Sequence, residues 1–388
     1  MERRNFLKLL GTAIVWWLYP RALTAESAEL KRSNRILVLL ELKGGNDGLN
    51  TVVPYGDANY YQLRPGLAIQ RDQVLQLSET LGINPRLEAL MDLWQQKELA
   101  IVSGVGYPQP NRSHFRSIEI WETGSSSSEY LQAGWLARAL KGRSISSKAV
   151  ADGAAIGGDA GPLAGGDLNV VVMRNIEKFL RQAQRVDEMK KTTDNPALKH
   201  LLAVQNDLHR SGQALSQMLN TKRSLGTEFP KTPIGRNLET AARLISADAR
   251  IPVIKVSHGG FDTHANQRAD HDGLLQQLAE ATAAFKLAVT QTGWWDRVLV
   301  MTYSEFGRRP AVNNSRGTDH GTAAPHFLMG GKIKGGIYGE QPSLKNLENG
   351  DLKFNVDYRR LYTTVTQNLW GLNDKFLKGG PYTVIDCL

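Results

Sequence analysis

The sequence predicts an α/β fold, a three-layer α/β/α sandwich around a mostly parallel sheet. Two observations lead to this expectation. Short apolar runs of strand length recur along the chain, and segments with helical spacing of apolar residues separate them. Continuous apolar runs suit strands that are buried on both faces, as in parallel sheets. Alternating strands and helices place helices on both faces of such a sheet.

Each expected strand is a short apolar run, and the run at residues 34–42, NRILVLLEL, comes first. The other strands are expected at 99–105, 148–156, 168–173, 251–256, 297–303 and 326–329. Helices are expected where apolar residues recur at helical spacing, at 85–97, 237–247, 274–289 and 358–369. A long polar stretch at about 176–222 also has a helical pattern, and we expect a surface layer or a helical insertion there.

The first 25 residues have the layout of a twin-arginine signal peptide. Arg3-Arg4 precede an apolar stretch at 9–19, and small residues at 22–25 offer a cleavage site. The apolar stretch is shorter than the roughly 20 residues of a membrane span. A buried N-terminal helix or an uncleaved anchor is the alternative. We expect a periplasmic protein, the twin-arginine translocase as its partner during export, no stable membrane span after cleavage, and one domain at 30–388.

The composition is that of a globular protein, with 41% hydrophobic and 22% charged residues. The formal charge is +9, but the basic residues are scattered and no nucleic-acid motif is present, which argues against nucleic acid as a partner. The chain has a single cysteine, Cys387. One cysteine can form neither an intramolecular disulfide nor a metal site built from several thiolates.

Acidic residues and histidines follow several of the expected strands. In open α/β sheets, ligands bind at the carboxyl ends of the strands, so these side chains are expected at one rim. Carboxylate and imidazole together suit one or two divalent ions, with zinc, manganese or calcium as candidates. The predicted metal ligands are Asp47, Asp262, His264, Glu305, Asp319 and His320.

A candidate nucleophile lies in the loop after the strand at 99–105. Ser113 is flanked by Arg112 and His114, and a serine in this setting could attack an anionic ester while its neighbours bind the ester oxygens. Structural roles remain open for several of these residues. Ser113 and Asp47 are also suited to capping a helix, and Glu305 to an ion pair with a neighbouring arginine.

Four segments that contain these residues resemble one bacterial family. They are GGNDGLNTVVPY at 44–55, GFDTH at 260–264, SEFGRR at 304–309 and GTDHGTAAP at 317–325. Together and in this order they resemble the domain-of-unknown-function family 1501, whose members are exported by the twin-arginine pathway. That family looks like a branch of the alkaline phosphatase and sulfatase superfamily. The resemblance implies an α/β/α sandwich with a two-metal site at the strand ends.

The resemblance also implies roles for individual positions. The superfamily pattern has an Asp after the first strand, matched by Asp47, and a serine or threonine nucleophile, matched by Ser113. Asp262 and His264 match one metal site, although their spacing is shorter than usual. The sequence departs from the pattern at Glu305-Phe306, where an Asp-His pair is expected. Asp319 and His320 are candidates to compensate for the missing imidazole.

Two functions fit these observations. The first is a metal-dependent hydrolase of a phosphate or sulfate ester in the periplasm, acting on an anionic small molecule or polymer. In this hypothesis Ser113 attacks, and His114 and Arg112 stabilise the anion. The alternative is a non-catalytic exported protein with the same fold that binds an envelope polymer or a partner protein. The departure at Glu305-Phe306 favours the alternative, whereas the acids, imidazoles and Ser113 favour the hydrolase.

Overall fold

A computed structural model describes residues 34–141, 149–183, 185, 193–220 and 224–388. The predicted signal peptide at 1–25 lies outside the described residues. Among the helices that are described, none is both long enough and apolar enough to cross a membrane.

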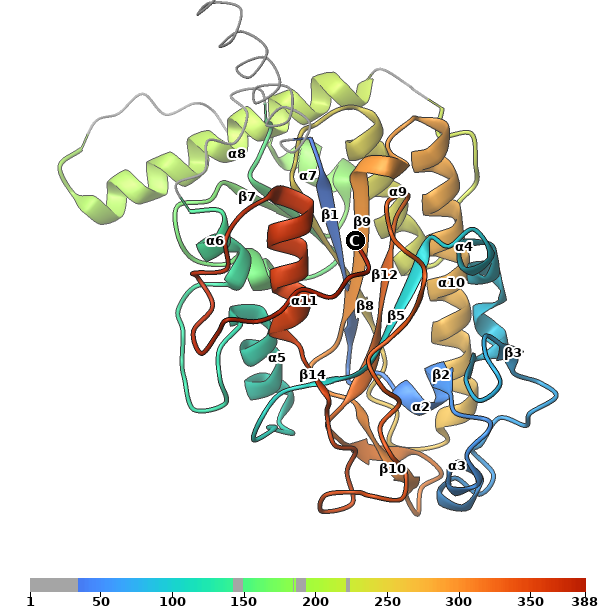
Figure 1. Ribbon diagram of the computed structural model, residues 1–388. Helices are drawn as coiled ribbons and strands as arrows, with labels where there is room; N and C mark the ends of the chain where they lie inside the picture. The colour runs from blue at the N-terminus through green and yellow to red at the C-terminus, as the bar shows by residue number, and fades with distance from the viewer. Residues whose placement is uncertain (1–33, 142–148, 184, 186–192, 221–223) are drawn as a thin grey trace, which may run out of the picture.

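A nine-stranded sheet forms the centre of the molecule (Figure 1). Its order is β13-β5-β12-β9-β1-β8-β6-β7, with β14 also paired to β5. The neighbours β9, β1, β8, β6 and β7 run parallel, and β12 runs antiparallel between β5 and β9. The bounds are β1 Ile36–Lys43, β5 Leu99–Gly106, β6 Gly153–Ile156, β7 Val170–Met173, β8 Val253–Gly259, β9 Val298–Tyr303, β12 Ala324–Met329, β13 Gly336–Tyr338 and β14 Val356–Asp357.

Strand β1 lies in the middle of the sheet and is buried on both faces until its last residue. Because side chains alternate along a strand, Val38 and Leu40 pack into one hydrophobic cluster, and Leu37 and Leu39 pack into the other. Each cluster is closed by its own layer of helices. The predicted mostly parallel α/β fold, with helices on both faces, is confirmed.

The two helical layers are unequal. The face that receives Val38 is covered by η1 Pro85–Leu90, α4 Met91–Gln95, α7 Ile176–Ala183, α8 Pro196–Asn220, α9 Pro233–Ser246 and α10 Gln267–Gln291. The other face is covered by α5 His114–Thr123, α6 Trp135–Ala139, α11 Arg359–Thr364 and the π-helical turn η4 Val365–Leu369. The polar stretch at 176–222 contains α7 and α8, and α8 extends beyond the sheet at the left of Figure 1.

Smaller elements gather at the carboxyl ends of the central strands. They are α2 Gly48–Thr51, α3 Ala58–Leu63, a sheet of β2 Val52–Val53, β4 Gly82–Ile83 and β3 Leu75–Gln76, and the pair β10 Arg308–Val312 and β11 Thr318–His320. Two further 3-10 turns are η2 Gly161–Leu163 and η3 Trp295–Arg297.

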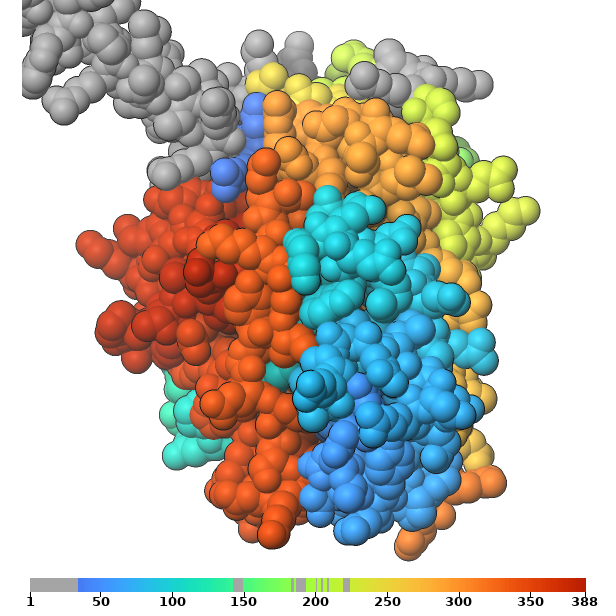
Figure 2. Space-filling model, turned by 45° about the vertical axis from the view of Figure 1, so that its right-hand side comes forward, coloured from blue at the N-terminus to red at the C-terminus, as the bar shows by residue number. Residues whose placement is uncertain are grey.

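A third hydrophobic cluster joins these elements to the C-terminal part of the chain. Leu49, Val53 and Tyr60 pack with Ala323 and Leu352. Figure 2 shows the corresponding surface, with the blue N-terminal segment packed directly against the orange C-terminal one. Segments far apart in sequence therefore enclose the rim of the sheet.

His326 is a buried base inside the core. It lies on β12 with 2% of its surface exposed, and its ring is inclined by 65° to that of Trp121, with the ring centroids 5.0 Å apart. Within the described residues neither ring nitrogen has a hydrogen-bond partner. Burial lowers the pKa of His326 from 6.5 to about 3, because the charged imidazolium would lose its hydration without gaining a partner.

We expect His326 to make the fold sensitive to acid. Below pH 6.5 His326 takes up a proton in the unfolded chain, whereas in the folded chain it does so only near pH 3. The free energy of unfolding is therefore highest above pH 6.5 and decreases as the pH falls from 6.5 toward 3. Between pH 7 and pH 5 the loss amounts to about 2 kcal/mol. In His326→Phe this part of the loss should vanish in urea unfolding at the two pH values. His209→Phe, on α8, is the control. An unchanged pH dependence in His326→Phe would contradict the assignment.

Candidate metal centre

Polar residues from distant parts of the chain meet at the carboxyl ends of the central strands, at the bottom of Figure 1. Asp262 follows β8 and Glu305 follows β9, while His114 opens α5 and His320 ends β11. Strands β1, β8 and β9 are parallel neighbours, so their carboxyl ends lie at one edge. The topology therefore positions these side chains as the ends of separate segments.

Three imidazoles surround one carboxylate, and we call His114, His264, His320 and Asp262 the histidine cluster. Asp262 Oδ1 lies 3.1 Å from His264 Nε2 and 3.3 Å from His320 Nε2, and Asp262 Oδ2 lies 3.4 Å from His114 Nε2. The Nε2 atoms of His264 and His320 are 2.8 Å apart. One ligand atom each from His114, Asp262 and His320 fits within 4.8 Å, close enough to share a metal ion.

The other ring nitrogen of each histidine faces an oxygen. His114 Nδ1 donates to Glu305 Oε1 at 2.8 Å, and His320 Nδ1 donates to the carbonyl oxygen of Arg112 at 2.8 Å. His264 Nδ1 faces Asp319 Oδ1 at 3.4 Å. Because these oxygens accept, each Nδ1 is assigned a hydrogen, and the Nε2 of each ring faces inward.

Inward-facing nitrogens beside a carboxylate need a cation or a hydrogen-bond donor among them, and Arg308 Nη1 is such a donor to His264 Nε2 at 3.4 Å. His114 Nε2 shows the need directly, because it is buried and has no hydrogen-bond partner within the described residues. Burial is the main cause that lowers the pKa of His320, so this ring favours its neutral form. Neutral imidazole and ionised carboxylate are the forms that bind metal ions.

Asp262 is kept ionised by Arg308. Burial raises its pKa, but the hydrogen bond and charge of Arg308, with a smaller contribution from His320, outweigh this and lower the pKa overall. Arg308 Nη2 lies 2.6 Å from Asp262 Oδ1. The guanidinium is itself buried, and it donates to the carbonyl oxygens of Gly44, Gly45, Phe261 and Thr318. Sequence reasoning considered Arg308, in the segment SEFGRR, only as an ion-pair partner of Glu305, whereas the structure pairs it with Asp262.

Glu305 supports the cluster from behind. Its carboxylate is 2% exposed and accepts from the backbone N–H of Gly44 at 2.9 Å and from the Ser304 hydroxyl at 3.2 Å, in addition to His114. Gly44 has φ +120°, and a Cβ there would lie 2.4 Å from the backbone nitrogen of Asp262. Glycine is required at this position because the end of β1 passes so close to the loop that carries Asp262.

Asp319 has a similar supporting place. It is exposed, and its Oδ1 accepts from Asn313 at 3.0 Å and faces His264. The hydrogen bond from Asn313 is the main cause that lowers its pKa. The structure thus places Glu305 and Asp319 behind the imidazoles rather than among the inward-facing ligand atoms.

Asp47 is also a predicted metal ligand, and the structure shows other partners at its carboxylate. It is fully buried and caps α2, with Oδ1 accepting from the backbone N–H of Leu49 at 3.2 Å. Its Oδ2 accepts from Arg64 at 2.5 Å and from Gln267. Burial raises the pKa of Asp47, but Arg64 outweighs burial and lowers it. The sequence did not reveal the distant arginine that makes this aspartate a structural anchor.

Ser113 and Arg112 precede the histidine cluster in the chain. Ser113 is exposed at the N-cap position of α5, and its hydroxyl makes no capping hydrogen bond, so capping does not explain this serine. The guanidinium of Arg112 pairs with Asp351. The contribution of Arg112 to the cluster is therefore its carbonyl oxygen, which holds His320.

Phe306 covers one side of the cluster. Its ring centroid lies 4.9 Å from that of His114 and 4.5 Å from that of His320. This is the residue that stands where the resemblance implies a further imidazole. The rings of Phe306, His114 and His320 form a compact aromatic wall, so the inward nitrogens are held in fixed directions.

Comparisons with known proteins give a family and a set of distant structures. Residues 91–379 match the family described as "Protein of unknown function (DUF1501)". No curated protein matches the sequence. Among solved structures, PsFucS1 sulfatase from Pseudoalteromonas sp. is similar with a TM-score of 0.42 and 12% identity, covering 93% of this chain and 72% of that chain.

Two further solved structures are similar to the same degree. A protein in the alkaline phosphatase superfamily from Vibrio parahaemolyticus has a TM-score of 0.39 and 10% identity, covering 88% of this chain and 68% of that one. The C-terminal periplasmic domain of EcEptC from Escherichia coli, in complex with Zn, has a TM-score of 0.40 and 12% identity, covering 88% and 84%. These values describe a distant similarity of fold and carry no information on activity.

The roles of Asp47 and Arg64 can be tested by unfolding. In Arg64→Ala the carboxylate of Asp47 stays buried without its counter-charge, so we expect a loss of about 3–5 kcal/mol in the free energy of unfolding. Urea denaturation measures this loss. Arg71→Ala is the control, because Arg71 is exposed and lies over the ring of nearby Tyr55. A loss below about 1 kcal/mol in Arg64→Ala would argue against the structural role of this pair.

Proposed function

The chain belongs to the family described as "Protein of unknown function (DUF1501)", and from this premise we propose that it is a metal-dependent hydrolase of a phosphate or sulfate ester that acts in the periplasm. The observation that carries the proposal is the histidine cluster. Three Nε2 atoms converge on one carboxylate, and an oxygen behind each ring fixes its direction.

The donor set fits a transition metal. Three imidazole nitrogens and one carboxylate oxygen are ligands that zinc binds readily, and manganese accepts the same types. Calcium takes oxygen ligands almost exclusively, so we rank it below the other two candidates. The carboxylates of Asp47 and Glu305 are engaged elsewhere. We therefore propose one ion, held by His114, His264, His320 and Asp262.

When bound, a divalent ion of this kind polarises an ester oxygen and lowers the pKa of a coordinated water or hydroxyl group. The residues of the chain supply the remaining functions. Ser113 is our candidate nucleophile, since it is exposed, directly precedes His114 and has a hydroxyl that is not used for capping. It also lies at the N-terminus of the ten-residue helix α5, where backbone N–H groups favour the negative charge of the ester.

The non-catalytic alternative has its own support. Phe306 stands at a position where the resemblance implies an imidazole, and Arg308 occupies an oxygen of Asp262. Both features reduce the number of ligand atoms that are available to a second ion. A one-ion site that binds an anionic envelope polymer without hydrolysing it is therefore the second candidate.

Metal content and turnover distinguish the two candidates. We expect the purified protein to carry about one equivalent of zinc or manganese by elemental analysis and to hydrolyse an aryl phosphate or an aryl sulfate. In His320→Ala, loss of one ligand should reduce metal affinity and turnover by more than about 100-fold. His209→Ala, on α8, is the matched control. Metal without turnover would favour the binding protein, and absence of both would reject the hydrolase.

Glu305 offers a second test, because it acts on the ion only through His114. In Glu305→Gln the side chain keeps its size but no longer presents a carboxylate to His114 Nδ1. We expect metal affinity to fall about 10–100-fold. A purely structural role would lower the free energy of unfolding of the metal-free protein and leave the metal dissociation constant unchanged, so both quantities should be measured. Gln276→Glu on the exposed surface of α10 is the control.

A further inference from the structure

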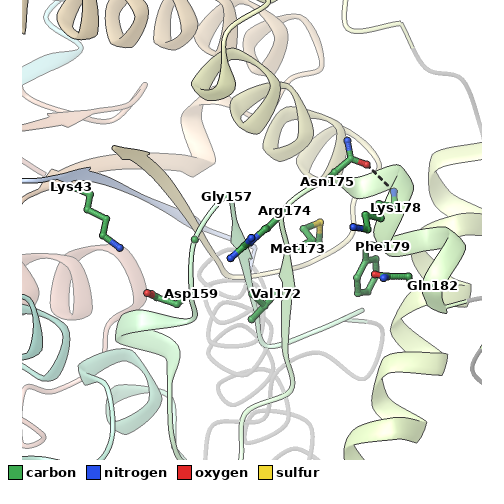
Figure 3. Close-up of a pocket in the computed structure, with 11 residues that line it drawn as sticks. Lys43, Gly157, Asp159, Val172, Met173, Arg174, Asn175, Lys178, Phe179 and Gln182 are labelled. Carbon is green, nitrogen blue, oxygen red and sulfur yellow. Dashed lines mark hydrogen bonds between the residues drawn. The ribbon is translucent and has the colours of Figure 1, made fainter. Parts of the chain in front are cut away.

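A second feature lies on the same edge of the sheet as the histidine cluster. It is a cavity of about 640 Å³ at the carboxyl ends of β1, β6 and β7 (Figure 3). Lys43 ends β1 and lines this cavity, whereas the next residue, Gly44, donates to Glu305 behind His114. The last residue of β1 and the residue after it thus lie at the cavity and behind the candidate metal centre, respectively.

The cavity has an excess of positive charge. Lys43, Arg174 and Lys178 line it, all three are exposed, and none forms an ion pair with an acid in the described part of the chain. Figure 3 shows Lys43 and Arg174 on opposite sides of Gly157. A concave surface lined by charges of one sign concentrates ions of the other sign.

Asp159 cancels only part of this charge: its carboxylate pairs with Lys255 and also interacts electrostatically with Lys43. It is the acid among the described lining residues, and its Oδ1 lies 2.6 Å from Lys255 Nζ. Lys255 is fully buried and also contacts Glu41 at 3.2 Å and Glu122 at 3.4 Å. Asp159 therefore shares Lys255 with two other acids, and it is one lining acid against three lining basic residues, which form no ion pair within the described part of the chain.

The positive surface continues beside the cavity. A smaller cavity of about 230 Å³ shares Gly157, Arg174 and Asn175 with the first and adds Arg236 from α9. Arg174 thus lies between the two spaces. Its planar guanidinium can bind two oxygens of one oxyanion at once, which gives the site direction as well as charge.

We propose that this basic cavity binds a second oxyanion, a sulfate or phosphate group, on the same substrate whose ester lies at the histidine cluster. The proposal rests on the proposed hydrolase function and narrows its substrate to a chain with repeated anionic groups. The volume lies within the range of ordinary ligand sites, about 300–1,000 Å³, and leaves room for one charged unit of such a chain. A small ester would reach the histidine cluster alone and leave the cavity empty.

The double variant Arg174→Ala/Lys178→Ala tests the proposal. Isothermal titration measures its affinity for three probes of matched length: a dextran sulfate oligosaccharide, a linear polyphosphate and uncharged dextran. We expect at least tenfold weaker binding of a charged probe, no measurable binding of uncharged dextran by either protein, and unchanged metal content. The KM for a small aryl ester should also stay unchanged.

The control double variant is Arg297→Ala/Lys375→Ala, which removes the same two charges. Arg297 directly precedes β9, at the amino end of the strand and so away from the cavity. Lys375 lies in the loop after η4, and both residues are exposed. Weaker binding of only one charged probe assigns the cavity to that oxyanion, and equal weakening of both supports a site for either. Unchanged affinity in the cavity variant, or the same weakening in the control, would overturn the proposal.

Binding and turnover separate this proposal from the hydrolase itself. Titration requires no hydrolysis, so cavity-dependent binding by a protein without turnover would reject the hydrolase and retain the oxyanion site. Turnover of the aryl ester with no effect of the cavity variant on either charged probe would reject only the oxyanion site.

Discussion

The rim of the sheet depends on one buried cation, the guanidinium of Arg308. It donates to carbonyl oxygens of the segments that follow β1 and β8 and of β11, and it pairs with Asp262. A buried guanidinium is costly unless its donors are used, and here four backbone oxygens, the Asp262 carboxylate and His264 Nε2 use them. Since carbonyl groups of separate segments meet at one point, the loops that carry Asp262 and His320 keep a fixed mutual position.

The candidate site is built in two tiers around that fixed point. The inner tier is the histidine cluster, and the outer tier consists of Glu305, Asp319 and the carbonyl oxygen of Arg112. The outer tier decides which nitrogen of each ring faces inward. Chemistry at the inner tier therefore depends on residues that need not touch an ion or a substrate.

Sequence reasoning reached the fold because the fold follows from local patterns. The apolar run at 34–42 predicts a strand buried on both faces, and β1 is that strand. The pattern also indicates which residues follow the strands. It does not show which acid meets an imidazole and which meets an arginine. Asp47 and Asp262 look alike in sequence, but Arg64 and Gln267 enclose the first, and the second faces the histidines. Such partners come from far along the chain, and no spacing rule identifies them.

The antiparallel direction of β12 has a further consequence. Because β12 runs opposite to β9, the chain leaves the sheet at the carboxyl end of β9 and re-enters it at the same edge. The excursion between them, residues 304–323, holds Glu305, Arg308 and His320 and includes the pair β10–β11. Both ends of this excursion are therefore anchored in neighbouring strands at one rim. A shift of the excursion would move Glu305, Arg308 and His320 together and reshape the mouth of the site while the strands of the sheet keep their register.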